Sequence, residues 1–249
     1  MRRLTTLALT AAAIAAPALA LQNTQQAEQP AAPPAEQAAP AAPAAAPAGT
    51  QLDAMVMTTP PMDGAPGSRD PAMVTAGTYM IDPGHTLVTF TVDHMGFSSF
   101  TGQLGNPEGT LTLDPANPGA ASVEVSFPIS EVSTTSPELD EHLQGEDFFD
   151  AANNPMGTFK STEVVVQGDR AAIRGDLTLR GVTKSVVLQT AFYGAGENPM
   201  SKAKTIGFRA TTTVNRSDFG IDYGLPAVSD EVLLVIDAAF EMQGAASEG

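Results

Sequence analysis

The sequence predicts an all-β domain, an antiparallel up-and-down β-barrel of roughly eight strands with one short inserted helix. Segments in which apolar and polar residues alternate recur from residue 77 to residue 243, and this is the period of half-buried strands. Turn residues join most neighbouring segments as hairpins, and one stretch carries the signals that begin a helix. Hairpin-linked strands with apolar inner faces favour a barrel over a sandwich.

The N-terminus has the three parts of a secretory signal peptide. Met1-Arg-Arg is the charged part, residues 4–15 form an apolar run, and Ala18-Leu19-Ala20 is a small-residue cleavage site. We therefore expect cleavage after Ala20 and export of the mature chain. No later stretch reaches the roughly 20 apolar residues of a membrane-spanning helix, so we expect no transmembrane segment in the mature chain.

The composition divides the rest of the chain into three parts. Residues 21–76 are rich in Ala, Pro and Gln and cannot bury enough apolar surface to become ordered, which predicts a disordered linker. Residues 77–243 have the size of one domain, and 244–249 are expected to form a flexible tail. The chain has no cysteine, so the domain has to be held by its core alone.

The charge balance excludes some partners. The formal net charge is −16 and the isoelectric point is about 4.3. Nucleic acid and anionic membrane surfaces are bound through basic patches, so neither is an expected partner.

The first predicted hairpin spans residues 86–104 and turns at Met95-Gly96. Alternation places four of its residues on one apolar face: Val88, Phe90, Val92 and His94. In a closed barrel this face points into the lumen. An imidazole is therefore expected near the rim of an apolar interior.

Two further strands and a helix follow. Residues 110–113 and 122–127 alternate, with turn residues at 114–119 between them. Ser136 as N-cap, Pro137 at the first helical position and acids in the first turn predict a short helix over 136–143. Phe148 and Phe149 then stand side by side in a polar connection, so at least one should pack over a barrel mouth.

The remaining strands are expected in the second half of the domain. The strands resume from Thr158, and a Gly168-Asp169 turn joins residues 163–167 to 170–180. The inner face of 185–193 stays unassigned, because Val186, Val187 and Leu188 are consecutive. Residues 204–216 and 231–242 alternate clearly. Glycines inside strands, such as Gly102, Gly175 and Gly207, help a sheet to bend and close.

Residues with catalytic or metal-binding chemistry are few. His85, His94 and His142 lack the close spacings of metal sites, so no metal is expected. No serine elbow or cysteine nucleophile is present. Residues 218–220, Asp-Phe-Gly, match a kinase tripeptide by letters alone, because the other kinase motifs are missing. The chain is not expected to be an enzyme.

Arg216 continues the inner face of Phe208 and Val214. A guanidinium at the end of an apolar strand needs a carboxylate or an anionic ligand. A head-group contact and a salt bridge to Asp218 or Asp222 are both compatible with the sequence.

The motifs, taken in order, resemble the YceI-like, polyisoprenoid-binding family over essentially the whole domain. They are Tyr79-x-Ile81-Asp82-Pro83-x-His85-Thr86, Phe90-x-Val92-x-His94-Met95-Gly96, Gly102, Asp147-Phe148-Phe149-Asp150 with Pro155, Phe159-Lys160-Ser161-Thr162, Gly175-x-Leu177-Thr178-Leu179-Arg180-Gly181-Val182-Thr183-Lys184, and Asn215-Arg216-x-Asp218-Phe219-Gly220. Thr86 departs from the serine that is common there.

The resemblance implies an extended lipocalin-like barrel, periplasmic in bacteria, that holds a polyprenyl phosphate or a quinone tail without covalent chemistry or a further cofactor. Fatty acids or fatty amides are alternative ligands. The residues expected to contact the lipid are Phe90, Val92, His94, Phe100, Phe127, Phe148, Phe149, Phe159, Leu177, Leu179, Phe208 and Arg216.

Two other classes of function remain open. The first is an enzyme that acts on the bound isoprenoid with His94 as base. The second is an envelope protein whose barrel is filled by its own side chains. A homodimer is compatible with either, and with a lipid carrier.

Overall fold

The computed structural model describes residues 63–243. The predicted signal peptide, most of the predicted linker and the predicted tail lie outside these residues.

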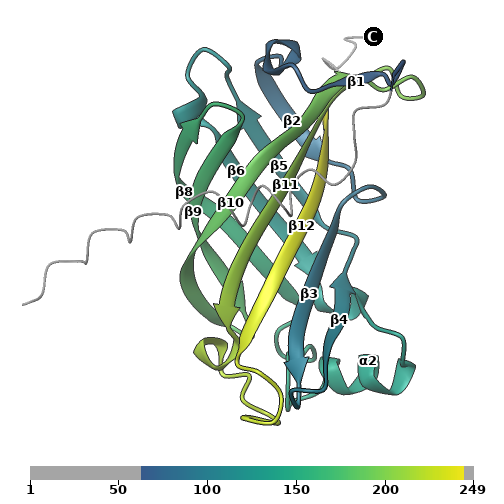
Figure 1. Ribbon diagram of the computed structural model, residues 1–249, viewed down its shortest axis with the longest axis vertical. Coiled ribbons are helices and arrows are strands. Elements are labelled where there is room, and N and C mark those ends of the chain that lie inside the picture. Colours follow the sequence, from purple (N-terminus) through teal and green to yellow (C-terminus); the bar gives the residue numbers. More distant parts are fainter. Residues whose placement is uncertain (1–62, 244–249) are drawn as a thin grey trace, which may run out of the picture. The chain divides into compact units, whose positions relative to one another are not determined.

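Eight antiparallel strands close a barrel (Figure 1). Hydrogen bonding runs around the ring from each strand to the next and returns from the last to the first. The strands are β2 (Gly77–Ile81), β5 (Glu108–Leu113), β6 (Ser122–Pro128), β8 (Met156–Gln167), β9 (Arg170–Leu179), β10 (Val182–Glu197), β11 (Lys204–Asn215) and β12 (Glu231–Met242). The predicted all-β barrel with one short helix is confirmed.

Three of the barrel's strands continue beyond a break. They extend as β3 (Leu87–His94), β4 (Ser98–Leu104) and β7 (Val132–Ser133), so that β12 pairs with β2 near one end and with β3 nearer the other. Thr86 lies at the first break, where its Oγ1 accepts a hydrogen bond from the backbone N–H of Ala239 at 3.0 Å. This hydrogen bond links the chain at the break to β12.

The predicted hairpin turn and the predicted helix are both present. Met95 and Gly96 have φ of 59° and 68°, and the N–H of Phe97 donates to the carbonyl of His94 at 3.1 Å. The helix α2 (Pro137–Gln144) begins after Ser136, whose Oγ accepts from the N–H of Leu139 at 3.4 Å. Four 3-10 turns complete the described elements: η1 (Pro71–Met73), η2 (Pro118–Ala120), η3 (Ile129–Glu131) and η4 (Arg216–Phe219).

The barrel has two distinct ends (Figure 1). The α2 end holds α2, the β3–β4 turn and the residues after η4. The β1 end holds the two-residue strand β1 (Gly67–Ser68), which pairs with Gly196 and Ala195 of β10.

The boundary predicted at residue 77 is too late. Residues 63–76, assigned to a disordered linker, include β1 and η1, and Val74 packs against the core. The hydroxyl of Tyr79 donates to the carbonyl of Thr75 at 2.6 Å. Composition missed this segment because its order comes from a few backbone contacts and one partly buried side chain rather than from apolar periodicity.

The interior consists of two apolar clusters. The β1-end cluster has a buried part, formed by Tyr79, Ile81, Leu111, Phe192, Ala195, Ile206 and Phe240, and partly exposed side chains such as Phe208 and Ala238 pack against it. The α2-end cluster has a buried part, formed by Leu104, Phe127, Ile129, Val132, Leu143, Phe159, Leu177, Phe219 and Ile221. It also has a rim of partly exposed apolar side chains, which include Phe90, Phe148, Phe149, Ile173, Leu179, Val186, Leu188 and Val214.

Candidate functional site

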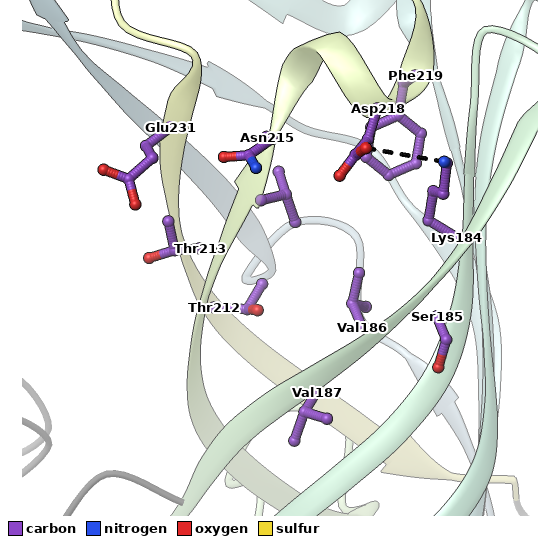
Figure 2. A pocket seen from close by; sticks show the side chains of 11 residues that line it. Lys184, Ser185, Val186, Val187, Thr212, Thr213, Asn215, Asp218, Phe219 and Glu231 are labelled. Carbon is purple, nitrogen blue, oxygen red and sulfur yellow. Dashed lines mark ion pairs between the residues drawn. The ribbon is translucent and has the colours of Figure 1, made fainter. Parts of the chain in front are cut away.

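The barrel wall is open between β10 and β11 towards the α2 end. The two strands pair from Glu197 and Lys204 down to Gln189 and Thr211, and the pairing ends there. A cleft of about 480 Å³ lies where they separate (Figure 2). It is lined by Lys184, Ser185, Val186, Val187, Thr212, Thr213, Val214, Asn215, Asp218, Phe219 and Glu231.

The floor of the cleft belongs to the barrel interior. Phe219 is a buried member of the α2-end cluster, and Val186 and Val214 pack against that cluster. Thr213 and Glu231, by contrast, are exposed. The cleft therefore crosses the wall from the outer surface to the apolar interior.

One ion pair spans the opening. Nζ of Lys184, on β10, lies 3.7 Å from Oδ1 of Asp218, on η4, and Figure 2 shows the two side chains facing each other. The side chains keep 44% and 55% exposure, so water screens their attraction. Exposed pairs of this kind contribute about 0–1 kcal/mol, so the contact can open at little cost.

The interior next to the cleft contains unfilled space. Phe90, Ile173, Leu179 and Leu188 lie on inner strand faces and pack against the α2-end cluster, yet each keeps partial exposure. Inside a closed barrel, such exposure requires a space wide enough for water. An eight-stranded barrel is just wide enough either to be filled by its side chains or to hold one ligand. Partly exposed inward side chains such as Phe208 also accompany the β1-end cluster, so what distinguishes the α2 end is the cleft that opens into it.

Glycines let aromatic rings lie along the wall at this end. A Cβ atom on Gly157 would lie 2.3 Å from the ring of Phe127, and one on Gly175 would lie 2.3 Å from the ring of Phe159. The rings occupy the space that a side chain would have taken. They cover the sheet without projecting further towards the barrel axis.

The structure brings together most of the predicted lipid contacts. Seven of them belong to the α2-end cluster: Phe90, Phe127, Phe148, Phe149, Phe159, Leu177 and Leu179. Val92 and Phe100 are cross-strand partners on the face of Phe90 and are partly buried. Phe208 lies elsewhere, against the β1-end cluster, with its ring 6.1 Å from that of Phe192.

His94 does not join the enclosed residues. It is the last residue of β3, its backbone bridges to Val228, and its side chain is exposed. The strand runs past the barrel at this point, so continued alternation no longer places a side chain in the lumen.

Arg216 is buried, but its partners differ from both expected kinds. Its guanidinium donates to four backbone carbonyls: Ser229 at 2.8 Å, Ile221 at 3.1 Å, Tyr223 at 2.8 Å and Val228 at 3.0 Å. Backbone carbonyls therefore take the place of a direct carboxylate contact, and Asp222, one of the two expected partners, acts on Arg216 through its charge. Burial lowers the pKa of Arg216, and the charges of Asp230 and Asp222 oppose that shift.

Arg180 also donates hydrogen bonds to backbone carbonyls, those of residues after α2 and after η4. Its Nη2 donates to the carbonyl of Glu146 at 2.7 Å, and its Nη1 donates to that of Gly220. Together the two arginines fix the loop after η4 and join it to the residues after α2.

Sequence reasoning missed the cleft residues, because the inner face of β10 was left unassigned. Counting back in twos from Phe192 would have identified Thr190, Leu188 and Val186 as inward. The outward position of Val187, between two inward apolar residues, hid that period. The separation of β10 from β11 has no sequence signal, since it depends on how far the pairing extends.

The described residues show neither a metal cluster nor a membrane-spanning helix. No group of three or more His, Cys, Asp or Glu residues suited to a metal ion occurs in 63–243. Over the same range, no helix has the length and apolar character needed to cross a bilayer.

An antiparallel eight-stranded barrel with a partly unfilled apolar interior and a side opening is the architecture of a small-ligand-binding barrel. The sequence profile of the YceI-like domain matches residues 79–240, and this chain belongs to that family.

Its relatives agree with this assignment. The protein YceI of Escherichia coli O157:H7 is 40% identical over 163 residues, which cover 65% of this chain and 85% of that protein. Among solved structures, BcnA of Burkholderia cenocepacia has a TM-score of 0.58 at 21% identity and covers 64% of this chain and 98% of its own. A polyisoprenoid binding domain from Saccharophagus degradans has a TM-score of 0.52 at 13% identity, covering 68% and 100%. The last two likenesses concern the fold alone.

Proposed function

We propose that this protein is a carrier that holds a long-chain isoprenoid lipid in the unfilled α2-end part of its barrel. The observation that carries the proposal is the set of inward apolar side chains that remain partly exposed and continue into the β10–β11 cleft. Each buried methylene of a ligand is worth about 0.8 kcal/mol, so an apolar chain alone can supply most of the affinity. The fold resembles that of a polyisoprenoid binding domain from Saccharophagus degradans, and this likeness supports the ligand class.

The lipid reaches the interior through the cleft. The cleft leads to the α2-end cluster, since Phe219, Val186 and Val214 belong to both. The cleft has an apolar floor and a polar rim, which suits a chain that slides in sideways from a lipid phase. The signal-peptide pattern at the N-terminus supports a periplasmic location.

Native mass spectrometry of the mature protein, before and after delipidation, tests the proposal. The untreated protein is expected to carry a lipid, and the delipidated protein is expected to take up all-trans geranylgeraniol. Absence of both would overturn the proposal. A bound fatty acid or fatty amide, with no isoprenoid uptake, would show that the barrel serves the alternative ligand class.

A pair of variants tests the route. Val214→Gln places a polar group on the inner floor of the cleft and is expected to reduce uptake, whereas Thr158→Gln changes an exposed residue of β8 outside the cleft and is expected to leave uptake unchanged. The melting temperature of each variant separates lost binding from lost folding. Equal uptake by both would show that the lipid enters elsewhere.

Catalysis on the lipid is the competing function, and it is distinguished by the fate of the ligand. A carrier returns the isoprenoid unchanged after prolonged incubation, whereas an enzyme releases a product of different mass. The exposed position of His94 favours the carrier, because a base acting on an enclosed lipid has to lie beside it.

A further inference from the structure

The separation of β10 from β11 leaves two strand edges open in the barrel wall. Pairing between the two strands ends at Gln189 and Thr211. Beyond that point β10 still pairs with β9 and β11 still pairs with β12, so each strand keeps a neighbour on one side only. A strand edge of this kind presents backbone N–H and C=O groups that no other strand satisfies.

The ladder pattern identifies which backbone groups face the gap. Along an antiparallel strand, residues that hydrogen-bond to one neighbouring strand alternate with residues that hydrogen-bond to the other. The N–H of Phe192 donates to the carbonyl of Asp169 at 2.8 Å, so the even-numbered residues of β10 before it face β9. The N–H of Arg216 donates to the carbonyl of Asp230 at 3.0 Å, so the even-numbered residues of β11 face β12.

The odd-numbered residues of the two strands consequently face each other across the cleft. They are Ser185 and Val187 on β10 and Thr213 and Asn215 on β11, and all four line the cleft. Within residues 63–243, neither the strand pairing nor the other backbone hydrogen bonds give these groups a partner across the gap. Both walls of the cleft therefore offer N–H donors and C=O acceptors above an apolar floor.

The cleft has room for a ligand group between these edges. Its volume of about 480 Å³ lies in the range of small-molecule pockets. Figure 2 shows Ser185 and Val187 on one side of the opening and Thr213 and Asn215 on the other. A lipid whose chain occupies the interior would leave its polar end at this level.

The charged side chains of the cleft disfavour an anionic head group. Among the described residues that line it, Lys184 is the only cation, and its Nζ already lies 3.7 Å from Oδ1 of Asp218. Glu231 adds a second carboxylate. A phosphate would have to separate Lys184 from Asp218 and approach two like charges, which repel it. A neutral group avoids both costs and still has the strand edges as hydrogen-bond partners.

We propose that the open edges of β10 and β11 bind the polar end of the lipid, and that the cleft selects a neutral hydrogen-bonding group, such as an alcohol or an amide, over a phosphate. This assignment rests on the proposed function. The apolar chain continues from the cleft past Val186 and Val214 into the α2-end part of the barrel.

The head-group preference is tested with geranylgeraniol, geranylgeranyl phosphate and the hydrocarbon squalene, on the delipidated full-length mature protein. Wild type is expected to bind the alcohol about fivefold more tightly than the phosphate, the scale of one exposed charge interaction, and salt should narrow the difference. Asp218→Asn and Glu231→Gln each remove a carboxylate and should bring the phosphate closer to the alcohol. Glu108→Gln, on an exposed residue of β5 outside the cleft, is the control and should keep the preference of wild type.

Proline substitution tests the strand edges, because proline lacks the backbone N–H. At Ser185 and Thr213 this N–H faces the gap, so proline breaks no ladder hydrogen bond. At least one of Ser185→Pro and Thr213→Pro should weaken geranylgeraniol about threefold to tenfold, the usual worth of one hydrogen bond, and leave squalene within about twofold. Thr213→Ala keeps the N–H and should lose less alcohol affinity than Thr213→Pro. Melting temperatures of the empty proteins report on folding.

Three results would overturn the assignment: wild type binds the phosphate as tightly as the alcohol, both proline variants keep the alcohol affinity of wild type, or both lose alcohol and squalene alike. The lipid-carrier proposal survives each of them. If the proline variants do not fold, the carboxylate variants decide, since an unchanged phosphate affinity in both would refute the selection. If no probe binds to wild type, the carrier proposal itself fails and the role of the strand edges fails with it.

Discussion

A Cβ atom on Gly102 would lie 2.2 Å from Cζ of Phe90, its cross-strand partner on β3. No real Cβ atom tolerates that distance, so the phenyl ring occupies the space above the glycine backbone. The same arrangement recurs where Phe127 covers Gly157 and Phe159 covers Gly175. These glycines set how far the rings reach into the lumen, in addition to any help in bending the sheet.

Gly102→Ala should therefore displace the Phe90 ring from its position against the strand backbone. We expect a loss of about 1–3 kcal/mol in unfolding free energy from overpacking and a weaker affinity for geranylgeraniol, because the displaced ring takes ligand space. Gly105→Ala is the control, since a Cβ there has no neighbour within 4 Å. Denaturant melts and lipid titrations measure both effects. If Gly102→Ala matched the control in both, the ring would not be constrained by this glycine.

The carbonyl contacts of Arg216 change what its replacement should do. Arg216→Met leaves the carbonyls of Ile221, Tyr223, Val228 and Ser229 without their donor. We expect unfolding free energy to fall by about 2–4 kcal/mol, with alcohol and phosphate probes affected alike. Arg174→Met, which removes a pair with Glu163 at 3.4 Å, should cost much less. A selective loss of phosphate binding without lost stability would instead support a head-group role for Arg216.

The strand patterns and the contacts of Arg216 differ in how far the sequence could predict them. Strand alternation, the Met95-Gly96 turn and the Ser136 cap depend on residues close in the chain, so the sequence could predict them. The inner rows of β9 and β11 followed for the same reason. The partners of Arg216 could not be predicted, because they are backbone groups of a loop whose path the side chain itself helps to define.

The segment before the barrel offers a sharper deletion test than the predicted boundary allowed. Removing residues 21–62 is expected to leave the melting temperature unchanged, because an Ala/Pro-rich stretch buries little area. Removing residues 21–76 also deletes β1, η1 and Val74, and should lower the melting temperature by several degrees. Equal melting temperatures for the two proteins would show that the contacts of 63–76 add nothing to stability.

Tyr79 gives this segment a pH dependence. Burial raises the pKa of its hydroxyl. A raised pKa means that the neutral form is favoured in the folded state, so its stabilisation is complete below the unfolded pKa of about 10 and is lost as pH rises above that value. Tyr79→Phe should cost about 1 kcal/mol at neutral pH and reduce the alkaline loss. Identical pH profiles for the two proteins would exclude Tyr79 as the cause.

The last prediction concerns the ion pair across the cleft, between Lys184 and Asp218. If the lipid passes between β10 and β11, this contact has to separate on the way in and on the way out. Lys184→Met should then raise the association and dissociation rates together, by up to about fivefold, and leave the dissociation constant nearly unchanged. High salt should also raise both rates of the wild-type protein, because it screens the pair.

Lys160→Met is the matched control, since it removes a pair with Glu124 at 3.2 Å, outside the set of cleft residues. Stopped-flow fluorescence with a labelled isoprenoid measures both rates. A change in affinity at constant association rate would make Lys184 a contact of the bound lipid, and unchanged rates would place the route of the lipid away from this cleft.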